Sequence, residues 1–158
     1  MSITIKNLTK DLKSVDLNDL LSSWRWLVQN PKQVIIVSTL GDLFTIENDN
    51  SIHWLQTDLG TYSKVAENLE EFYDMLGYEE NIDNWFLPLL NEKLITAKKP
   101  LKANEIYSCI KPTILGGVLS PENIHVVNMS VHFAFTGALH EQIKDLPDGT
   151  AVNIKFTQ

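Results

Sequence analysis

Residues 33–56 read QVIIVSTLGDLFTIENDNSIHWLQ and hold three short runs of β-branched and aromatic residues separated by turn residues. Runs of this kind, with Gly-Asp and Asn-Asp-Asn between them, are typical of antiparallel strands joined by tight turns. A fourth run follows a further turn at Asp58-Leu59-Gly60. The stretch therefore predicts a small antiparallel sheet with strands at Gln33–Thr39, Leu43–Glu47, Ser51–Gln56 and Thr61–Val65.

Two helical patterns flank these strands in the sequence. Asp16 is placed to cap a helix whose apolar residues, from Leu17 to Val28, follow the spacing of one helical face. Asn68 is followed three residues later by a glutamate, which has the form of a capping box. We expect it to begin a helix with apolar residues from Leu69 to Leu76, ended by Gly77.

The second half of the chain mixes helices and strands. A helical pattern begins behind Asn81 and continues through Pro88, which predicts a kink or two abutting helices because proline removes a backbone hydrogen bond. The order of strands, then helices, then strands again is typical of an α+β fold rather than of repeated βαβ units. Further strands are expected at Glu105–Ile110, Ile124–Asn128 and Ala151–Phe156, a turn at Ser120-Pro121 and a helix at Ser130–Ile143.

Length and composition predict one globular domain. The chain has 158 residues, of which 44% are hydrophobic and 21% are charged, and these values exclude disordered and low-complexity classes. We expect an N-terminal lead-in over residues 1–16 and a single α+β domain over residues 17–158. No run is long enough to span a membrane, and no signal-peptide core is found. A single cysteine, Cys109, permits no internal disulfide, which is typical of a cytoplasmic protein.

The negative charge of the chain is concentrated in its middle. Twelve acidic residues and one base, Lys64, lie between Gly41 and Glu92, a net charge of −11, whereas the rest of the chain has eight acids and twelve bases. Affinity for phosphate depends on Lys and Arg, so we expect no direct binding of nucleic acid or of an anionic membrane. Surplus acid also keeps a protein soluble, and this simpler interpretation stays open. If the charge serves recognition, it favours a cationic partner.

The expected partner-binding residues are acidic side chains that recur at helical spacing. Like-charged pairs three or four residues apart destabilise a helix slightly, so a partner would have to compensate for them. Trp26, two residues from Trp24, cannot share one helical face with it, so Trp26 is either covered by another element or an exposed aromatic anchor. The candidate partner-binding residues are Glu67, Glu70, Glu71, Asp74, Glu79, Glu80, Asp83 and Trp26.

No motif for catalysis, for a metal or for a cofactor is found. The glycine pair Gly116-Gly117 lacks the lysine and the helix of a phosphate-binding loop, so we interpret it as a turn. The four histidines form no ligand pair at metal-binding spacing, and we interpret them as structural. Cys109 lies among apolar residues with no sequence signature that pairs it with a histidine, which favours a buried structural thiol. We expect no catalytic residues, no metal and no cofactor.

Several motifs together resemble one protein family. The chain is similar, from about Leu17 to Phe156, to the domain found at the C-terminus of type VI secretion immunity proteins. There it often follows a domain called GAD-like and neutralises a DNase toxin. Only about sixteen residues precede the first expected helix here, so a GAD-like part is expected to be truncated or absent. The motifs are Leu20–Val28, Thr39–Phe44, Leu69–Phe72, Asn84–Pro88, Leu115–Gly117, Val131-His132 and Leu139–Gly149.

A fainter resemblance, to the SUKH superfamily of immunity proteins, comes from residues 39–54 together with the helix that follows. Resemblance and charge together favour a non-enzymatic immunity protein that binds and neutralises a cognate cationic toxin, for which a type VI DNase effector is one candidate. Two alternatives remain open. One is a small-molecule-binding domain or enzyme with a polar pocket near His132, His140 and the Gly116-Gly117 loop. The other is a module that self-associates, for example as a homodimer.

Overall fold

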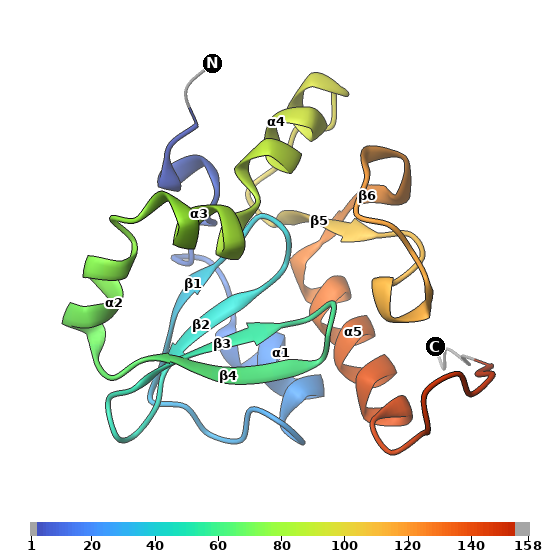
Figure 1. Cartoon of the computed structure of the whole chain (residues 1–158), viewed down its shortest axis with the longest axis horizontal. Helices are drawn as coiled ribbons and strands as arrows, with labels where there is room; N and C mark the ends of the chain where they lie inside the picture. Colours follow the sequence, from blue (N-terminus) through green and yellow to red (C-terminus); the bar gives the residue numbers. More distant parts are fainter. Residues whose placement is uncertain (1–2, 154–158) are drawn as a thin grey trace.

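The computed structural model describes residues 3–153 as a mixed arrangement of helices and two antiparallel sheets (Figure 1). The α+β fold expected from the sequence is confirmed. Strands are β1 (Gln33–Val37), β2 (Leu43–Ile46), β3 (Ile52–Gln56), β4 (Thr61–Ala66), β5 (Glu105–Cys109) and β6 (Ile124–Asn128). Helices are α1 (Leu17–Leu21), α2 (Leu69–Met75), α3 (Glu79–Phe86), α4 (Pro88–Thr96) and α5 (Met129–Ile143). Short 3₁₀ turns are η1 (Ile5–Asn7), η2 (Ser22–Trp24), η3 (Thr113–Leu115) and η4 (Pro121–Asn123).

The four-stranded sheet separates two apolar cores. Its strands are antiparallel in the order β1-β2-β3-β4, as the alternation of apolar runs and turns predicts. Successive side chains point to opposite faces of a strand, so Leu43 and Leu55 lie in one core whereas Phe44 and Trp54 lie in the other. All four are buried. The sheet is therefore covered on both faces.

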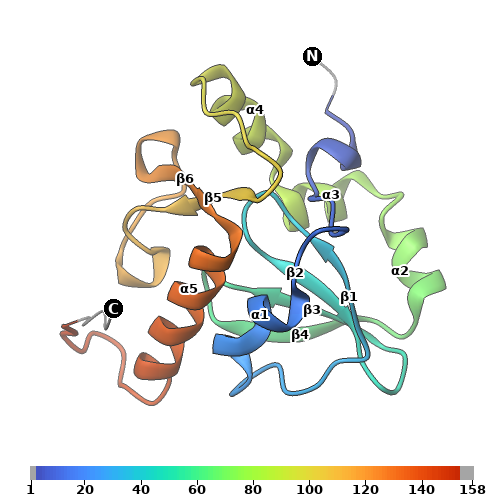
Figure 2. The same ribbon diagram turned by 180° about the vertical axis from the view of Figure 1, so that it is seen from behind.

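Different helices cover the two faces. The core around Leu43 also contains residues of α1, η2 and α5, and α1 lies behind the sheet in Figure 1 and in front of it in Figure 2. The core around Phe44 contains Phe72 from α2 and Trp85 from α3, together with Leu8 from the N-terminal stretch. A third, smaller cluster joins α4 to the β5-β6 pair. Helices α2 and α5 thus belong to separate cores.

The first helix is shorter than its apolar spacing suggests. Asp16 caps it as expected, because its carboxylate accepts a hydrogen bond from the Asp19 amide over 3.1 Å. The α-helix ends at Leu21 and continues as a 3₁₀ turn to Trp24. Since the backbone leaves the α-helical path, Trp24 and Trp26 do not lie on opposite faces, and their rings stack with centroids 5.6 Å apart. The expectation that the two tryptophans face different surroundings is wrong for this reason.

The Pro88 region forms two abutting helices, as one of the two sequence interpretations has it. Leu87 lies between α3 and α4 with φ 47°, in the left-handed region, and Pro88 occupies the first turn of α4. Proline is tolerated there because the amide at this position has no partner within the helix. Helix α3 begins at Glu79, earlier than the Asn81 boundary read from the sequence.

The ends of the described chain differ in how they pack. Leu8 is fully buried and Thr9 forms a β-bridge with Ser38, so part of the N-terminal stretch packs on the sheet. Residues 151–153 are in no strand, and the rest of the strand expected at Ala151–Phe156 lies outside the described residues. Within residues 3–153, no helix has both the length and the apolar character required to cross a membrane.

Candidate functional site

The seven acidic residues predicted to bind a partner are exposed on two consecutive helices and the residues just before them. Helices α2 and α3 follow β4 and stand at one side of the molecule in Figure 1, away from α5. Their acidic residues lie on the outer surface of the core around Phe72. We call this surface the acidic face, and its members are Glu67, Glu70, Glu71, Asp74, Glu79, Glu80 and Asp83.

Two members of the acidic face have partners within the protein. Lys64 Nζ forms an ion pair with Glu67 over 2.7 Å. Glu71 closes the start of α2, because its carboxylate accepts a hydrogen bond from the Glu67 amide over 2.8 Å, while Asn68 accepts from the Glu71 amide over 2.9 Å. The sequence signal at Asn68 is thus confirmed as a helix cap. The other five carboxylates make no side-chain hydrogen bond or ion pair within the described part of the chain.

Exposed aromatic side chains accompany these acids. Tyr73 is 59% exposed and Tyr78 is 66% exposed. Tyr73 also lines a shallow groove together with Ile5, Glu79 and Asp83. The sequence places Phe72 and Tyr73 together on the apolar side of α2. Only Phe72 is buried, because α2 is a short helix that packs on the sheet over a narrow strip. Aromatic side chains such as these are enriched at protein–protein interfaces.

Trp26, the remaining predicted anchor, does not lie with the acidic face. Its ring is half-buried against Trp24 in the core that α5 covers, and its indole N–H donates to the Gly137 carbonyl over 3.2 Å. Lys144 Nζ lies 5.2 Å from the Trp26 ring centroid, a cation–π contact. The structure therefore gives Trp26 intramolecular contacts on the opposite side of the sheet from α2.

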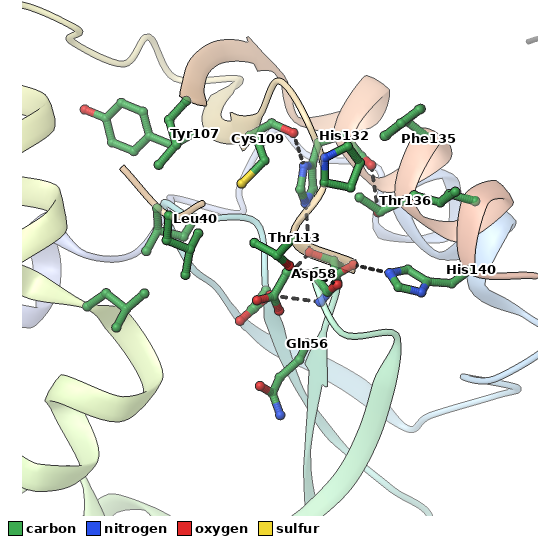
Figure 3. A pocket seen from close by; sticks show the side chains of 18 of the residues that line it. Leu40, Gln56, Asp58, Tyr107, Cys109, Thr113, His132, Phe135, Thr136 and His140 are labelled. Atoms are coloured by element: carbon green, nitrogen blue, oxygen red, sulfur yellow. Dashed lines mark hydrogen bonds between the residues drawn. The ribbon is translucent and has the colours of Figure 1, made fainter. Parts of the chain in front are cut away.

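A cavity of about 230 Å³ lies at the end of the sheet that carries the β1-β2 turn and the end of β3. We call it the sheet-end cavity. Figure 3 shows Gln56, Asp58 and Thr113 beside it, with Leu40 and Tyr107 on another side and His132 and His140 entering from α5. A single water needs only roughly 10–15 Å³, so the space accommodates a ligand of several heavy atoms. Its remaining described lining residues are Asp42, Trp54, Thr57, Asn84, Trp85, Leu87, Ser108, Cys109, Pro112, Leu119, Ile124, Phe135, Thr136 and Leu139.

His132 is fully hydrogen-bonded in the wall of this cavity. Its Nε2 lies 3.1 Å from the Gly41 carbonyl and 2.9 Å from the Thr57 hydroxyl, and its Nδ1 lies 2.8 Å from the Ser108 hydroxyl. A carbonyl can only accept, so Nε2 carries the proton and Nδ1 accepts from Ser108. Burial lowers the pKa of His132 to about 4, which keeps the ring neutral at pH 7. The structural interpretation of this histidine is confirmed.

His140, two helical turns further along α5, contacts the same end of β3, at Thr57. Its Nε2 lies 2.9 Å from the Thr57 carbonyl, to which it donates. Burial lowers its pKa, and the nearby Asp58 carboxylate opposes that change. Gly41 and Gly60, both with positive φ, lie directly against the rings of His132 and His140. The two histidines therefore fasten α5 to two turns of the sheet.

Asp42 is the most strongly perturbed acid of the cavity. Its Oδ1 accepts from the Thr57 amide over 3.0 Å and lies 3.3 Å from the Thr57 hydroxyl. Burial, followed by the charge of Asp58, raises the pKa of Asp42 to about 8, although hydrogen bonds from Thr57 and the indole of Trp54 oppose the change. Asp42 is half-buried and lines the cavity. Burial likewise raises the pKa of Asp58.

The cavity has no arrangement typical of nucleophilic or metal catalysis among the described residues. Cys109 is a free thiol whose pKa is raised by burial, so it is held in its unreactive form. Both nitrogens of His132 are already occupied, which leaves none to activate a nucleophile. No group of three or more His, Cys, Asp or Glu within residues 3–153 is arranged to hold a metal ion.

Residues 66–140 match the family model described as T6SS immunity protein Tdi1, C-terminal. This segment, slightly less than half of the chain, is similar to the C-terminal domain of type VI secretion immunity proteins. This is the family that the sequence motifs resemble, although the matched segment is shorter than the Leu17–Phe156 range over which the motifs extend. The immunity-family segment contains every member of the acidic face and both histidines of α5, but it excludes Trp26, Asp42 and Trp54.

A comparison of structures finds a similar fold in the crystal structure of Atu4351 from Agrobacterium tumefaciens, with 14% sequence identity and a TM-score of 0.52. The match covers 77% of this chain and 63% of that one, so the chain spans less than two thirds of that protein's length. At this identity the likeness to Atu4351 shows the fold alone. No match was found among the curated proteins.

Proposed function

We propose that this protein is a non-enzymatic immunity protein that binds and neutralises a cognate toxin with a basic surface, and that the acidic face is the binding surface. The family of residues 66–140 supports an immunity role. The single observation that carries the choice of surface is the group of exposed acids on α2 and α3, five of which have no partner in the described chain. Tyr73 and Tyr78 add exposed apolar area beside them.

The physical reason for this choice is electrostatic. A nuclease must hold a polyanion and therefore presents a basic groove, which an acidic inhibitor reaches quickly because long-range attraction raises the association rate. Exposed tyrosines supply the buried aromatic contacts that dominate the affinity of many interfaces. A DNase effector of a type VI system fits this chemistry, and a toxin that attacks DNA would be neutralised in the cytoplasm.

Charge reversal on the acidic face tests this proposal. The variant replaces Glu70, Asp74 and Asp83, three carboxylates without intramolecular partners, by lysine. We expect the association rate with the toxin encoded by the neighbouring reading frame to fall by roughly tenfold or more at low salt, and its salt dependence to flatten. Stopped-flow or surface-plasmon measurements at several ionic strengths provide the rates.

A matched control reverses three exposed acids near the end of α5, Glu141, Asp145 and Asp148, and so changes the net charge equally. If the acidic face is the binding surface, this control slows association only slightly. Equal slowing in both variants would show that only the overall charge matters. Unchanged kinetics in the acidic-face variant would exclude that face as the interface.

A further inference from the structure

The sheet-end cavity holds acids but no basic counter-ion. Asp42 and Asp58 line it, and the other titratable lining residues are Tyr107, Cys109 and the two histidines of α5. No lysine or arginine lines it, and the one ion pair within residues 3–153 lies elsewhere, between Lys64 and Glu67. The cavity is thus unsuited to phosphate or carboxylate ligands, which need a cation or an array of donors.

Hydrogen-bond donors lie beside the buried Asp42 carboxyl. The Thr57 amide donates to Oδ1 at 3.0 Å, and the Thr57 hydroxyl lies 3.3 Å from the same oxygen. Trp54, only 8% exposed, also lines the cavity, and its buried indole N–H has no other hydrogen-bond partner within the described residues. The Thr57 amide and hydroxyl are thus the donors beside this acid, and the hydroxyl lies closer to the Gly41 carbonyl, at 2.8 Å. Without a positive charge nearby, burial still outweighs them.

The histidines do not provide that positive charge. His132 is neutral and has both nitrogens in hydrogen bonds, and His140 donates to the Thr57 carbonyl. Burial lowers the pKa of both rings. The residues that line the cavity therefore supply no positive charge to Asp42 and Asp58.

We propose that the sheet-end cavity binds a small organic cation, with its ammonium or amidinium group at Asp42 and Asp58 and its apolar body against the aromatic and aliphatic wall. Trp85, Leu40 and Leu119 contribute to that wall. An indole ring is a favourable neighbour for an organic cation, because its π face is electron-rich. Asn84 lines the cavity from α3, whereas Asp83 of the same helix lines the groove beside Tyr73, so the cavity and the acidic face open on different sides of α3.

Binding of a cation would be coupled to loss of a proton. At pH 7 the Asp42 carboxyl, with a pKa of about 8, is largely protonated in the free protein. A bound cation favours the carboxylate, so the proton leaves to solvent as the cation enters. The affinity should then rise with pH up to about 8 and level off above it. Asp58, Cys109, His132 and His140 face the same space, and the two histidines stay neutral over this range.

Benzamidine, an organic cation, is a suitable probe, because two compounds of nearly the same shape serve as controls. Benzamide has no charge, and benzoate has a negative charge. Titration of the full chain is followed by isothermal calorimetry and by tryptophan fluorescence. We expect saturable binding of benzamidine and at least roughly tenfold weaker binding of benzamide and benzoate, which corresponds to about 1.4 kcal/mol. Calorimetry in buffers of different ionisation enthalpy should show proton release at pH 7. Absence of saturable benzamidine binding, or equal binding of benzamide, would overturn the proposal.

Two isosteric variants test whether the cation binds in the cavity. Asp42→Asn and Asp58→Asn should each weaken benzamidine binding tenfold or more, whereas Asp145→Asn, an exposed acid at the end of α5, should leave it unchanged. Equal weakening by Asp145→Asn would indicate unspecific attraction and contradict the proposal, as would unchanged affinity in both cavity variants. If Asp42→Asn fails to fold, the proposal is tested by the benzamidine affinity of Asp58→Asn and by the pH dependence of that affinity in the unaltered chain. These outcomes do not depend on toxin binding, so each proposal can fail alone.

Discussion

At the scale of single residues, two glycines decide how closely the sheet approaches α5. Gly41 and Gly60 have φ values of 84° and 70°, and each lies against a histidine ring. A Cβ on Gly41 would lie 2.6 Å from His132 Cδ2, and one on Gly60 would lie 2.6 Å from His140 Cγ. Neither ring can retreat without losing its hydrogen bonds. The two turns therefore require glycine for both conformation and space.

Replacing Gly41 by alanine should destabilise the fold by about 2 to 4 kcal/mol, because positive φ costs about 1 kcal/mol for alanine and the overlap with His132 adds to it. Gly149→Ala is the matched control, since Gly149 has a similar φ of 81° but no atom within 4 Å of the added Cβ. Urea unfolding gives both free energies. A Gly41→Ala loss no larger than that of Gly149→Ala would show that the overlap is relieved without cost.

The pH dependence of stability should change when Asp42 becomes asparagine. The pKa of Asp42 in the folded chain, about 8, lies above the ordinary value of 3.8, so the folded chain binds more protons than the unfolded chain between these pH values. The free energy of unfolding therefore falls as the pH rises from about 4 to 8. Asp42→Asn should therefore gain stability relative to the unaltered chain by about 2 to 4 kcal/mol between pH 5 and pH 8. Thermal unfolding at several pH values measures this. A constant difference between the two proteins would contradict the assigned direction.

Sequence reasoning predicts some site residues and misses others. The histidines of α5 are correctly interpreted as structural because polar residues on an apolar helix must be paired when buried. Asp42 and Trp54 have no such signal, since the register in which β2 pairs with β3 brings them together. Tyr73 is misplaced because helical spacing shows which residues share a side, but not how wide the buried strip is.

At the scale of elements, the junction between α3 and α4 depends on a buried amide. Asn91, on α4, accepts from the Thr39 hydroxyl over 2.6 Å and donates to the carbonyls of Phe86 and Leu87 over 3.0 and 3.1 Å. It thus joins both helices to the end of β1. Pro88 predicts the break between the helices, but nothing in the sequence indicates that Asn91 holds them, because Thr39 is 52 residues away.

Asn91→Ala should cost about 2 to 4 kcal/mol of unfolding free energy, because it removes three buried side-chain hydrogen bonds and leaves the Thr39 hydroxyl without its acceptor, although the Leu87 carbonyl keeps the amide of residue 91. Asn84→Ala, on the neighbouring helix and exposed, should cost less than about 1 kcal/mol. Chemical denaturation of both variants gives the comparison. Similar losses in the two variants would mean that water replaces the Asn91 hydrogen bonds at little cost.

At the scale of the whole molecule, local rules predict the elements but not their assembly. Alternating apolar residues and turn residues place β1 to β4, and β5 and β6 follow from short apolar runs between turn signals. The pairing of these strands, the sheet-end cavity and the distribution of helices over the two faces depend on contacts between distant segments. The closing strand expected from the sequence is not formed at residues 151–153. An alternating pattern indicates a strand but does not supply a neighbouring strand with which it can pair.

The separation of two cores by one sheet has a consequence for how such a protein can diversify. The acidic face is supported by the core around Phe72, whereas α5 and its histidines belong to the opposite core around Phe133. Substitutions on the exposed surface of α2 and α3 therefore leave the packing of α5 on the other side of the sheet intact. The two halves of the molecule can accumulate changes independently of each other.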